Sequence, residues 1–421
     1  MTFIKKLRTI RKARDMTQLQ LAVEMGYNAS TVDNYENERN RISAKVYKAF
    51  KVATGTVDVP ITDEEMLIFK NEQLNAWNHM VNFGDIEKAK ELQLALAYRV
   101  KWSYDVEMQL LYDIYNINYY SRIDKKEESD KMVASLKERE AEFTEEHWYW
   151  YYRYLGSLEH WNWKYKAAMA LYMKAEEIGN RIGLNDNAIY YNIGNCLTHM
   201  GYSYLAMLYL EKIQLKELNV INMGLWFTIQ SLLAINYSKL GRTDEALELL
   251  ESSLEYCLKE KSSDRLSSVY FSLGWVHKNS GNFEKALENY DLASSCYIDK
   301  GEMYLSCLCH KVLLLRANNK NDEATKYINE GLYIATKGSL WYEWLQAIRY
   351  SLMLDEKGAI GYLEFTSIPK LREYGMHEIV MSCYEWIDKY YLDIGKYKYA
   401  HKYAQKAAMI YKKLMEGDMS I

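Results

Sequence analysis

Three residues of one segment carry the side chains that hold a transition metal in many proteins. Cys307, Cys309 and His310 are close together in the chain, and thiolate and imidazole groups are common zinc ligands. In a helix, residues two apart point in different directions, and the sequence offers no second pair of ligands at a matching spacing. We therefore expect buried thiols in a helical core rather than a metal site, and we expect no cofactor.

Motifs for enzymatic catalysis are absent from the sequence. It contains no phosphate-binding glycine loop, no glycine-rich dinucleotide motif, no Gly-x-Ser-x-Gly and no His-Glu-x-x-His. Its eight histidines are dispersed along the chain. The sequence therefore predicts a protein that is not an enzyme.

The composition is that of a soluble helical protein. Only Pro60 and Pro369 would interrupt a helix, and β-branched runs bounded by turn residues are nearly absent. No stretch stays apolar over the roughly 18 residues that a membrane span needs. The amino-terminal segment lacks the apolar core of a secretion signal, and the six cysteines are too scattered for a disulfide framework. We expect an all-α protein in the cytoplasm that makes no contact with membranes.

The charge is divided unevenly along the chain. Residues 1–59 hold eleven Lys or Arg and six Asp or Glu, a net charge of +5, so the remainder carries −9 of the overall −4. A basic segment joined to an acidic body is typical of a DNA-binding head on a protein-binding body.

Residues 1–59 have the pattern of four short helices. The first is amphipathic and ends at Asp15. Thr17 caps a second helix over 18–25, Gly26 makes a turn because glycine accepts a positive φ, and Asn28 caps a third helix over about 29–37. A fourth helix follows over 43–54. The polar face of the first helix consists of basic side chains, Lys5, Lys6, Arg8, Arg11 and Lys12.

A helix-turn-helix pattern crosses the second and third of these helices. It reads Thr17-Gln18-x-x-Leu21-Ala22-x-x-x-Gly26, then Ser30-Thr31-Val32-x-x-Tyr35-Glu36-Asn37, and it resembles the DNA-binding domain of the phage-repressor (Xre/Cro-like) family. Ala22 is small where two helices cross, and Val32 and Tyr35 anchor the recognition helix. Where the family usually has glycine this chain has Glu38, so the third helix is expected to run longer.

The resemblance implies which side chains meet operator DNA. Amide and hydroxyl groups near the recognition helix would contact base edges or nearby phosphates, namely Gln18, Asn28, Ser30, Thr31 and Asn34. Basic side chains beyond it would contact phosphates, namely Arg39, Arg41 and Lys45. Asn28 is explained equally well by its cap alone.

After Pro60 one spacing recurs through the rest of the chain. Thr62 and Glu65 form a capping box that begins a new helix, which divides the chain into domains over 1–59 and 63–421. Glycine precedes alanine by five residues at Gly84-Ala89, Gly201-Ala206, Gly241-Ala246, Gly281-Ala286 and Gly395-Ala400. Related turns are expected at Asp124, Trp163 and Asn319, and near Gly358. Turns about 40 residues apart are typical of a solenoid.

The clearest repeat is Tyr270-x-x-Leu273-Gly274-x-x-His277-x-x-x-Gly281-x-x-x-x-Ala286-x-x-x-Tyr290-x-x-Ala293, which resembles the tetratricopeptide repeat. Small residues at Gly274 and Ala286 let the two helices of a hairpin approach closely. The resemblance implies a right-handed superhelix of about nine helical hairpins. We expect the aromatic run over 147–152 to pack between hairpins.

In such arrays the first helix of each hairpin lines the inner, concave surface. The register of Gly274 places there Phe271, Ser272, Trp275, Lys278 and Asn279; equivalent positions elsewhere are Arg153, Tyr154, Asn192, Asn195, His199, Lys239 and Arg316. An asparagine can pair with both the N–H and the C=O of an extended peptide, and Arg153 or Arg316 could hold a carboxylate. Each of these residues could equally be solvated in an open groove.

A phage-repressor-like head joined to a tetratricopeptide body resembles the RRNPP regulators of Gram-positive bacteria, and the length is more similar to the NprR branch. The resemblance implies a homodimer or higher oligomer that binds operator DNA and a short signalling peptide in the concave groove. In the alternative, the body binds a protein partner such as a response regulator. Repeat proteins without a DNA-binding head can dephosphorylate a response regulator, but such an enzyme has no need of the pattern over 18–37.

Overall fold

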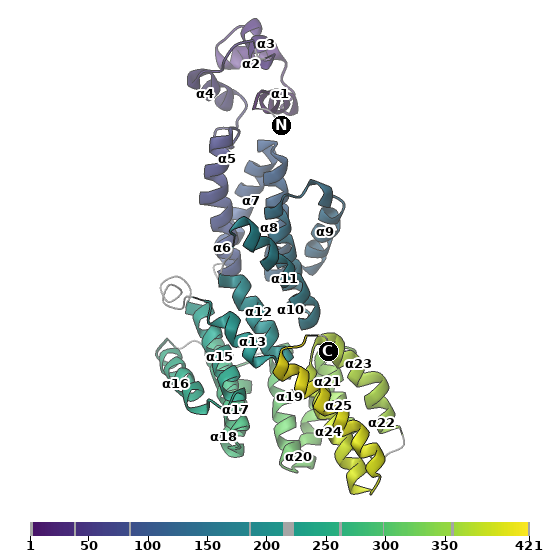
Figure 1. Cartoon of the computed structure of the whole chain (residues 1–421). Coiled ribbons are helices and arrows are strands. Elements are labelled where there is room, and N and C mark those ends of the chain that lie inside the picture. The colour runs from purple at the N-terminus through teal and green to yellow at the C-terminus, as the bar shows by residue number, and fades with distance from the viewer. Residues whose placement is uncertain are drawn as a thin grey trace. The chain divides into compact units, whose positions relative to one another are not determined.

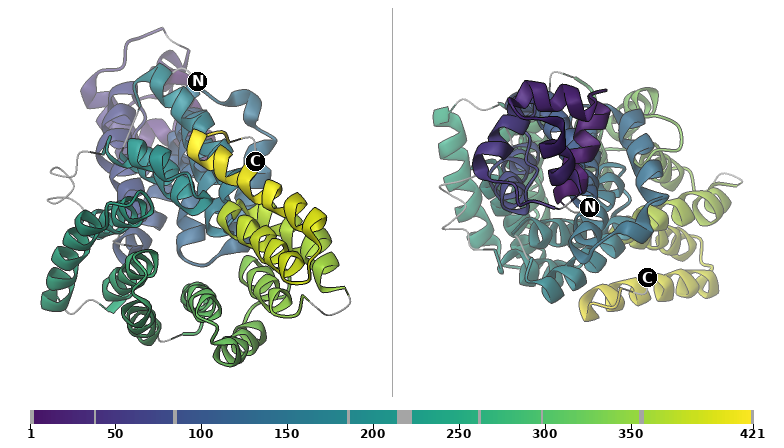
Figure 2. Two further views of the ribbon diagram at one scale, coloured as in Figure 1. Left: turned by 60° about the horizontal axis from the view of Figure 1, so that its bottom comes forward. Right: turned by 90° about the horizontal axis from the view of Figure 1, so that it is seen from above.

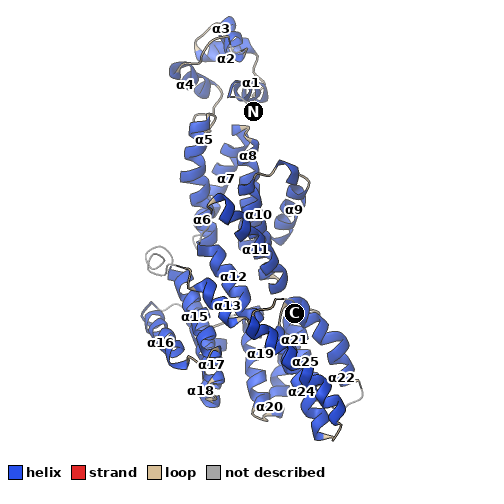
Figure 3. Cartoon of the chain, viewed as in Figure 1, coloured by secondary structure: helices blue, strands red, loops and turns tan. Residues whose placement is uncertain are grey.

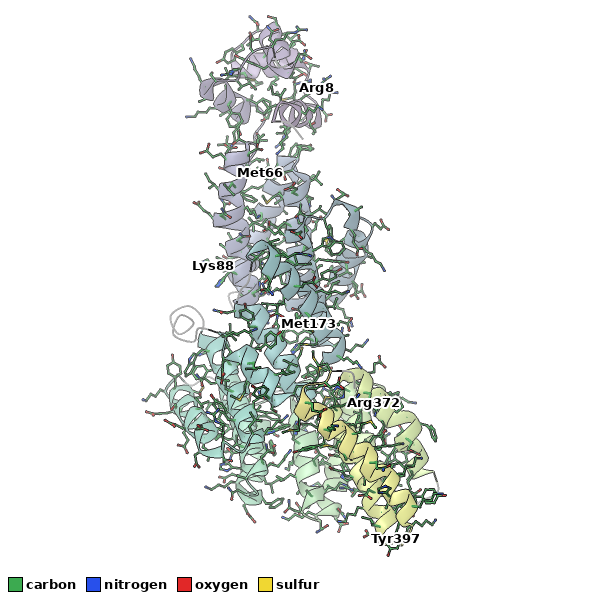
Figure 4. All side chains as sticks on the ribbon, in the orientation of Figure 1. Arg8, Met66, Lys88, Met173, Arg372 and Tyr397 are labelled. Carbon is green, nitrogen blue, oxygen red and sulfur yellow. The ribbon has the colours of Figure 1, made fainter. Side chains whose placement is uncertain are left out.

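The structure is a computed structural model, and it describes residues 3–37, 39–83, 86–184, 187–213, 223–260, 263–297, 299–354 and 358–419. Every regular element in those ranges is a helix and none is a strand, which confirms the all-α prediction (Figure 3). None of these helices is long and apolar enough to cross a bilayer. Contacts divide the chain into an N-terminal unit, Met1–Tyr154, and a C-terminal unit, Leu155–Ile421.

The head consists of four helices that end close to the predicted residues (Figure 1). They are α1 (Phe3–Ala13), α2 (Gln18–Met25), α3 (Ala29–Glu36) and α4 (Ala44–Ala53). Their apolar faces share one core, which also includes Val59 and Ile61 from the segment before the body. Glu38, on which the longer third helix was predicted, lies outside the described residues. The division into domains at residues 59 and 63 stays a prediction.

Two residues of α1 correct the predicted basic face. Lys6 and Arg11 are buried, with exposed fractions of 1% and 7%. The Nζ of Lys6 donates to the carboxylate of Asp105 at 2.8 Å, and the guanidinium of Arg11 pairs with Glu36. Helical spacing places Lys6 and Arg11 on either side of the apolar residues Leu7 and Ile10, but it cannot show which acidic partners cover them.

The pair of Lys6 and Asp105 is one of several contacts between the head and the body helices inside the N-terminal unit. The guanidinium of Arg14 lies over the ring of Trp102 at 3.8 Å and donates to the Tyr98 hydroxyl at 2.8 Å. That hydroxyl donates in turn to the carbonyl of Gly55 at 3.0 Å. The head is therefore docked on the body helices rather than suspended from a linker.

The body begins at α5, where Thr62 and Glu65 form the predicted capping box. The body helices of the N-terminal unit are α5 (Asp63–Phe69), η1 (Lys70–Leu74), α6 (Asn75–Phe83), α7 (Ile86–Ser103), α8 (Val106–Arg122), α9 (Lys126–Lys137) and η2 (Glu140–Glu142). The next helix, α10 (Glu145–Trp161), crosses the boundary between the two units. Its aromatic run packs as predicted: Tyr149 is buried, and Trp150 meets Tyr115 edge to face at 5.2 Å.

The helices of the C-terminal unit follow as successive hairpins (Figure 1). They are α11 (Tyr165–Ile182), α12 (Asn187–Met200), α13 (Ser203–Leu210), α15 (Met223–Lys239), α16 (Thr243–Glu260), α17 (Ser263–Asn279), α18 (Phe283–Ser295), α19 (Glu302–Ala317), α20 (Asn321–Ile334), α21 (Leu340–Ser351), α22 (Ala359–Tyr362), η3 (Leu363–Ser367), α23 (Ile368–Tyr374), α24 (His377–Asp393) and α25 (Tyr397–Glu416). The end of α25 returns to α13, where the Tyr202 hydroxyl donates to the carbonyl of Asp418 at 3.0 Å (Figure 2).

The predicted turns carry the backbone geometry that the spacing requires. Positive φ values occur at Gly201, Gly241, Gly281, Gly358 and Gly395, and also at Asp124, Trp163 and Asn319, where residues other than glycine were expected to make the turn. Gly84 lies outside the described residues. The alanine after each of these glycines in the repeated spacing is fully or almost fully buried, as at Ala206, Ala246, Ala286 and Ala400.

Close approach inside a hairpin depends on the absence of a side chain at one position. A Cβ added to Gly274 would lie 2.7 Å from the ring of Tyr290, and one added to Gly156 would lie 2.7 Å from Tyr172. Both distances are too short for van der Waals contact. The predicted role of Gly274 is therefore confirmed.

Candidate DNA-binding and ligand-binding surfaces

Local hydrogen bonds fix the turn between α2 and α3. Thr17 caps α2, and Gly26 ends that helix with φ of 74°. The Oδ1 of Asn28 caps α3: it accepts from the backbone N–H of Thr31 at 2.8 Å and from the hydroxyls of Ser30 and Thr31 at 2.8 and 2.6 Å. Asn28 thus shapes the start of α3, while the hydroxyl oxygens of Ser30 and Thr31 have lone pairs with which to accept from a ligand.

Three helices of the head meet at Glu36. Arg11 donates to both of its carboxylate oxygens, Nε to Oε1 at 2.5 Å and Nη2 to Oε2 at 2.9 Å, and Gln18 donates Nε2 to Oε2 at 2.9 Å. Burial raises the pKa of Glu36, but the hydrogen bonds from Arg11 and Gln18 outweigh burial and hold that pKa below its usual value. Gln18 therefore belongs to the frame that positions α3, and its contact with DNA stays a prediction.

The other predicted DNA contacts lie further out on the head. Arg41 and Lys45 are exposed, and Asn34 is half-buried. Arg39 pairs with Asp33 at 3.2 Å, but both side chains are exposed, so the pair is weak and a phosphate can compete for the guanidinium. These positions put three cations near α3 and α4, and their roles in DNA binding stay predictions.

In the C-terminal unit, aromatic and cationic side chains form a row across three consecutive hairpins. Trp275 of α17 lies 4.5 Å from the ring of His310 of α19, and His310 lies 5.0 Å from the ring of Trp344 of α21. The Nζ atoms of Lys278 and Lys239 lie 4.4 and 5.0 Å from the centroid of Trp275. Because α17, α19 and α21 are the first helices of their hairpins, this row lies where the concave lining was predicted.

Several polar atoms along this row are buried without a hydrogen-bond partner in the protein. On the helices of the row they include two donors, Nε1 of Trp275 and of Trp344, and one acceptor, Oε1 of Gln346; Oδ1 of Asn195 is a further unpartnered acceptor on α12. Nδ1 of His310 is also unpartnered; burial, with a smaller effect of Lys278, lowers the pKa of this imidazole well below its usual value, so it is neutral. Buried polar atoms in folded proteins are usually paired with protein groups or ordered water, so these atoms are available to bond to water or to a ligand.

Two cavities adjoin this row. One, of about 370 Å³, has Lys278, Arg316 and Trp386 in its lining, and the other, of about 360 Å³, has Lys239, Asn279 and Glu378. Lys239 pairs with Glu378 at 2.8 Å. Asn279 donates Nδ2 to the hydroxyl of Ser238 at 3.1 Å. Four predicted lining residues thus face two cavities on either side of the end of α17.

The remaining predicted lining residues are not all open to a ligand. Asn195 is 7% exposed, and its Nδ2 donates to the Tyr191 hydroxyl at 3.3 Å, whereas Asn192 is half-buried. Arg153 and Tyr154 belong to the N-terminal unit and are buried, with exposed fractions of 3% and 1%. The assignment of all four to peptide binding stays a prediction.

The cysteines of the metal-like cluster lie in the helical core. Cys307 and Cys309 are buried, and burial raises the pKa of the Cys307 thiol to about 12, which keeps it protonated. Among the described residues, no three His, Cys, Asp or Glu side chains are placed to hold a metal ion. His310 is instead surrounded by aromatic rings.

Sequence reasoning missed His310 and Trp344 as lining residues. His310 could have been found, because it precedes the turn at Asn319 by the same nine residues that separate Ser272, a predicted lining residue, from Gly281. Trp344 could not, because the hairpin near Gly358 contains the irregular segment η3 and has no repeat register to extend.

Comparisons with known proteins agree with the predicted helix-turn-helix and with the predicted tetratricopeptide repeats. A helix-turn-helix family model matches residues 7–55, and a tetratricopeptide-repeat model matches residues 227–299. Response regulator aspartate phosphatase A of Bacillus subtilis (strain 168) is 22% identical over 373 residues, which cover 82% of this chain and 95% of that protein.

Two solved structures share the fold. A Rap protein complexed with competence and sporulation factor has a TM-score of 0.71 at 16% identity, covering 84% of this chain and 99% of that one. NprR in complex with its cognate peptide NprX has a TM-score of 0.71 at 18% identity, covering 83% and 99%. This chain thus joins a helix-turn-helix segment to a body that contains a tetratricopeptide-repeat segment, and its fold is similar to that of these Rap and NprR structures.

Proposed function

We propose that this protein is a peptide-responsive transcription regulator. The observation that carries the proposal is the set of buried polar atoms without a protein partner on α12 and on the row of α17, α19 and α21 in the C-terminal unit. The indole N–H groups of Trp275 and Trp344 can donate to peptide carbonyls, and Oδ1 of Asn195 can accept from a peptide N–H. An extended peptide presents both kinds of group along its length, so it fits this row better than a small apolar molecule.

The head supplies the DNA-binding half of the proposal. Its helix-turn-helix is rigidly framed by Arg11, Gln18 and Glu36, which leaves Ser30, Thr31 and Asn34 of α3 to meet base edges. The resemblance to RRNPP regulators supports a homodimer that reads a two-fold operator, in which each recognition helix enters one half-site. Peptide binding would change the affinity for that operator by favouring one of two arrangements of the heads.

The test uses the full-length protein and a pool of short synthetic peptides, starting with any encoded beside its gene. A peptide that binds the native state raises the melting temperature with increasing saturation. Trp344→Phe keeps an aromatic ring, smaller than indole, and removes one unpaired donor, so it should reduce the shift. Trp226→Phe makes the same change at a residue that packs in another cluster, so it should not. Absence of a shift with every peptide, in a protein that still binds its promoter DNA, would contradict peptide sensing.

A second candidate function is binding of a protein partner, favoured by the relative named as a response regulator aspartate phosphatase. The N-terminal unit also exposes Leu67, Ile68 and Leu94 on α5 and α7, with exposed fractions of 60%, 47% and 78%. Such side chains suit a protein surface. A receiver domain phosphorylated with acetyl phosphate distinguishes the two candidate functions. If this protein retains that domain or speeds its dephosphorylation, protein-partner binding is supported. Leu94→Asp should then abolish the retention or the dephosphorylation without altering a peptide-induced shift in melting temperature.

A further inference from the structure

The cavity lined by Lys278 and Arg316 has an unusual charge. Its volume is about 370 Å³, and its walls come from α17, the turn after α17, the start of α18, α19 and α24. Trp386 and Phe283 supply aromatic walls. Two cations line it, and none of its described lining residues is acidic.

Arg316 has no acidic partner in the described part of the chain. Its guanidinium lies over the ring of Trp386 at 4.3 Å, and Nη2 makes one long hydrogen bond of 3.4 Å to the carbonyl of Ser351. Nε is buried and unpartnered. Burial lowers the pKa of Arg316 to about 10, which still leaves it charged at neutral pH. The fork of N–H donors that suits a carboxylate is therefore largely unused.

Lys278 likewise has no acidic partner among the described residues. Its Nζ lies 4.4 Å from the centroid of Trp275, and no described carboxylate is within ion-pair distance. Burial lowers the pKa of Lys278, and Glu378, the carboxylate that opposes this shift, is already paired with Lys239 at 2.8 Å. Glu378 and Lys239 cancel, so two uncompensated positive charges remain at the cavity.

Lys278 and Arg316 are half-buried cations without a counter-ion, and partial removal of a charge from water costs free energy that an anion would recover. We propose that this cavity is a subsite for a carboxylate of the peptide ligand, held between the guanidinium of Arg316 and the ammonium of Lys278. The inference rests on the proposed function. Trp386 and Phe283 would pack against the apolar part of the residue that carries the carboxylate. The ligand is therefore a peptide that places a carboxylate in this cavity, either its free C-terminus or an Asp or Glu side chain.

The test is capture of peptides from a synthetic library of random heptapeptides by the immobilised full-length protein, followed by mass-spectrometric sequencing. The library is made twice, with free and with amidated C-termini. We expect wild-type protein to enrich carboxylate-bearing peptides about tenfold over their amide counterparts, which corresponds to about 1.4 kcal/mol. Preference only in the free-acid library identifies the C-terminal carboxylate, and preference for Asp or Glu in both libraries identifies a side chain.

Variants test whether this cavity is the source of the carboxylate preference. Arg316→Met and Lys278→Met should lose the preference, whereas Arg316→Lys should keep part of it and shows that the fold tolerates change at this position. Arg349→Gln, at an exposed arginine of α21, should keep the full preference. Captured peptides with no preference for carboxylates, or with a preference for Lys and Arg, would overturn this inference and leave peptide sensing intact. A protein that captures no peptide yet binds DNA would overturn both.

Discussion

Arg316→Met should make the free protein more stable. Burial lowers the pKa of Arg316 to about 10, whereas a guanidinium ordinarily titrates above ~12; the difference corresponds to about 3 kcal/mol against the charged form in the folded state. A cation whose folded-state pKa is lowered carries this penalty at every pH below that pKa, so it is complete at pH 7.5. Residual solvent contact and the stacking on Trp386 return about 1–2 kcal/mol, which leaves a gain of about 1 kcal/mol for the methionine.

The measurement is thermal unfolding of the full-length protein followed by calorimetry. A gain of about 1 kcal/mol in a unit of this size raises the melting temperature by roughly 2–4 °C. Arg349→Met is the matched control, because that arginine is exposed on α21, and it should change the melting temperature by less than about 1 °C. Repeating the scan at pH 9 should give the same difference between wild type and Arg316→Met, since both pH values lie below the pKa of about 10.

A fall of several degrees in Arg316→Met would refute this reasoning. It would mean that the contacts of Arg316 with Trp386 and Ser351 hold α19 to α21 and α24, so that the residue is retained for structure. A gain in stability together with loss of carboxylate preference would show the opposite, a residue that the fold tolerates for the sake of a ligand.

Three further predictions concern the pH dependence, the hairpin packing and the DNA-binding surface. Burial raises the pKa of Asp113 to about 6, so the charged carboxylate destabilises the folded state above that pH, and this destabilisation is relieved as the pH falls below about 6. Asp113→Asn should therefore raise the melting temperature at pH 7.5 and have a smaller effect at pH 4.5, as measured by calorimetry. Equal effects at both pH values would contradict this assignment. Gly274→Ala should destabilise by about 1–3 kcal/mol because its Cβ would strike Tyr290, measured by denaturant unfolding, whereas Gly361→Ala, with open space around it, should be neutral or stabilising. Arg41→Gln should weaken operator binding and lower the slope of log affinity against log salt by about 1, and an unchanged slope in a fluorescence titration would remove this residue from the interface.

Features that depend on near neighbours in the chain could be predicted from the sequence. The caps at Thr17 and Thr62 need only the residue three positions on, and the turns at Gly201 and Gly281 need only a residue that accepts a positive φ. The spacing between those turns then predicted the hairpins. Each of these signals lies within one helix or one turn.

The parts that the sequence could not reveal depend on partners far along the chain. Lys6 is buried because Asp105 reaches it from 99 residues away, and no pattern inside α1 contains that information. His310 looked like a metal ligand because of its neighbours at 307 and 309. The rings that surround it come from α17, α18 and α21, which only the packing of successive hairpins brings together.

The docking of the head on the body bears on promoter architecture. Because Lys6, Arg14 and Gly55 are each tied to the body helices, the head cannot swivel freely to reach half-sites at different separations. In the proposed dimer, each head would keep its orientation to the body helices of its own N-terminal unit. The operators of that dimer should then tolerate changes of base sequence between the half-sites far better than the insertion of half a helical turn, about five base pairs.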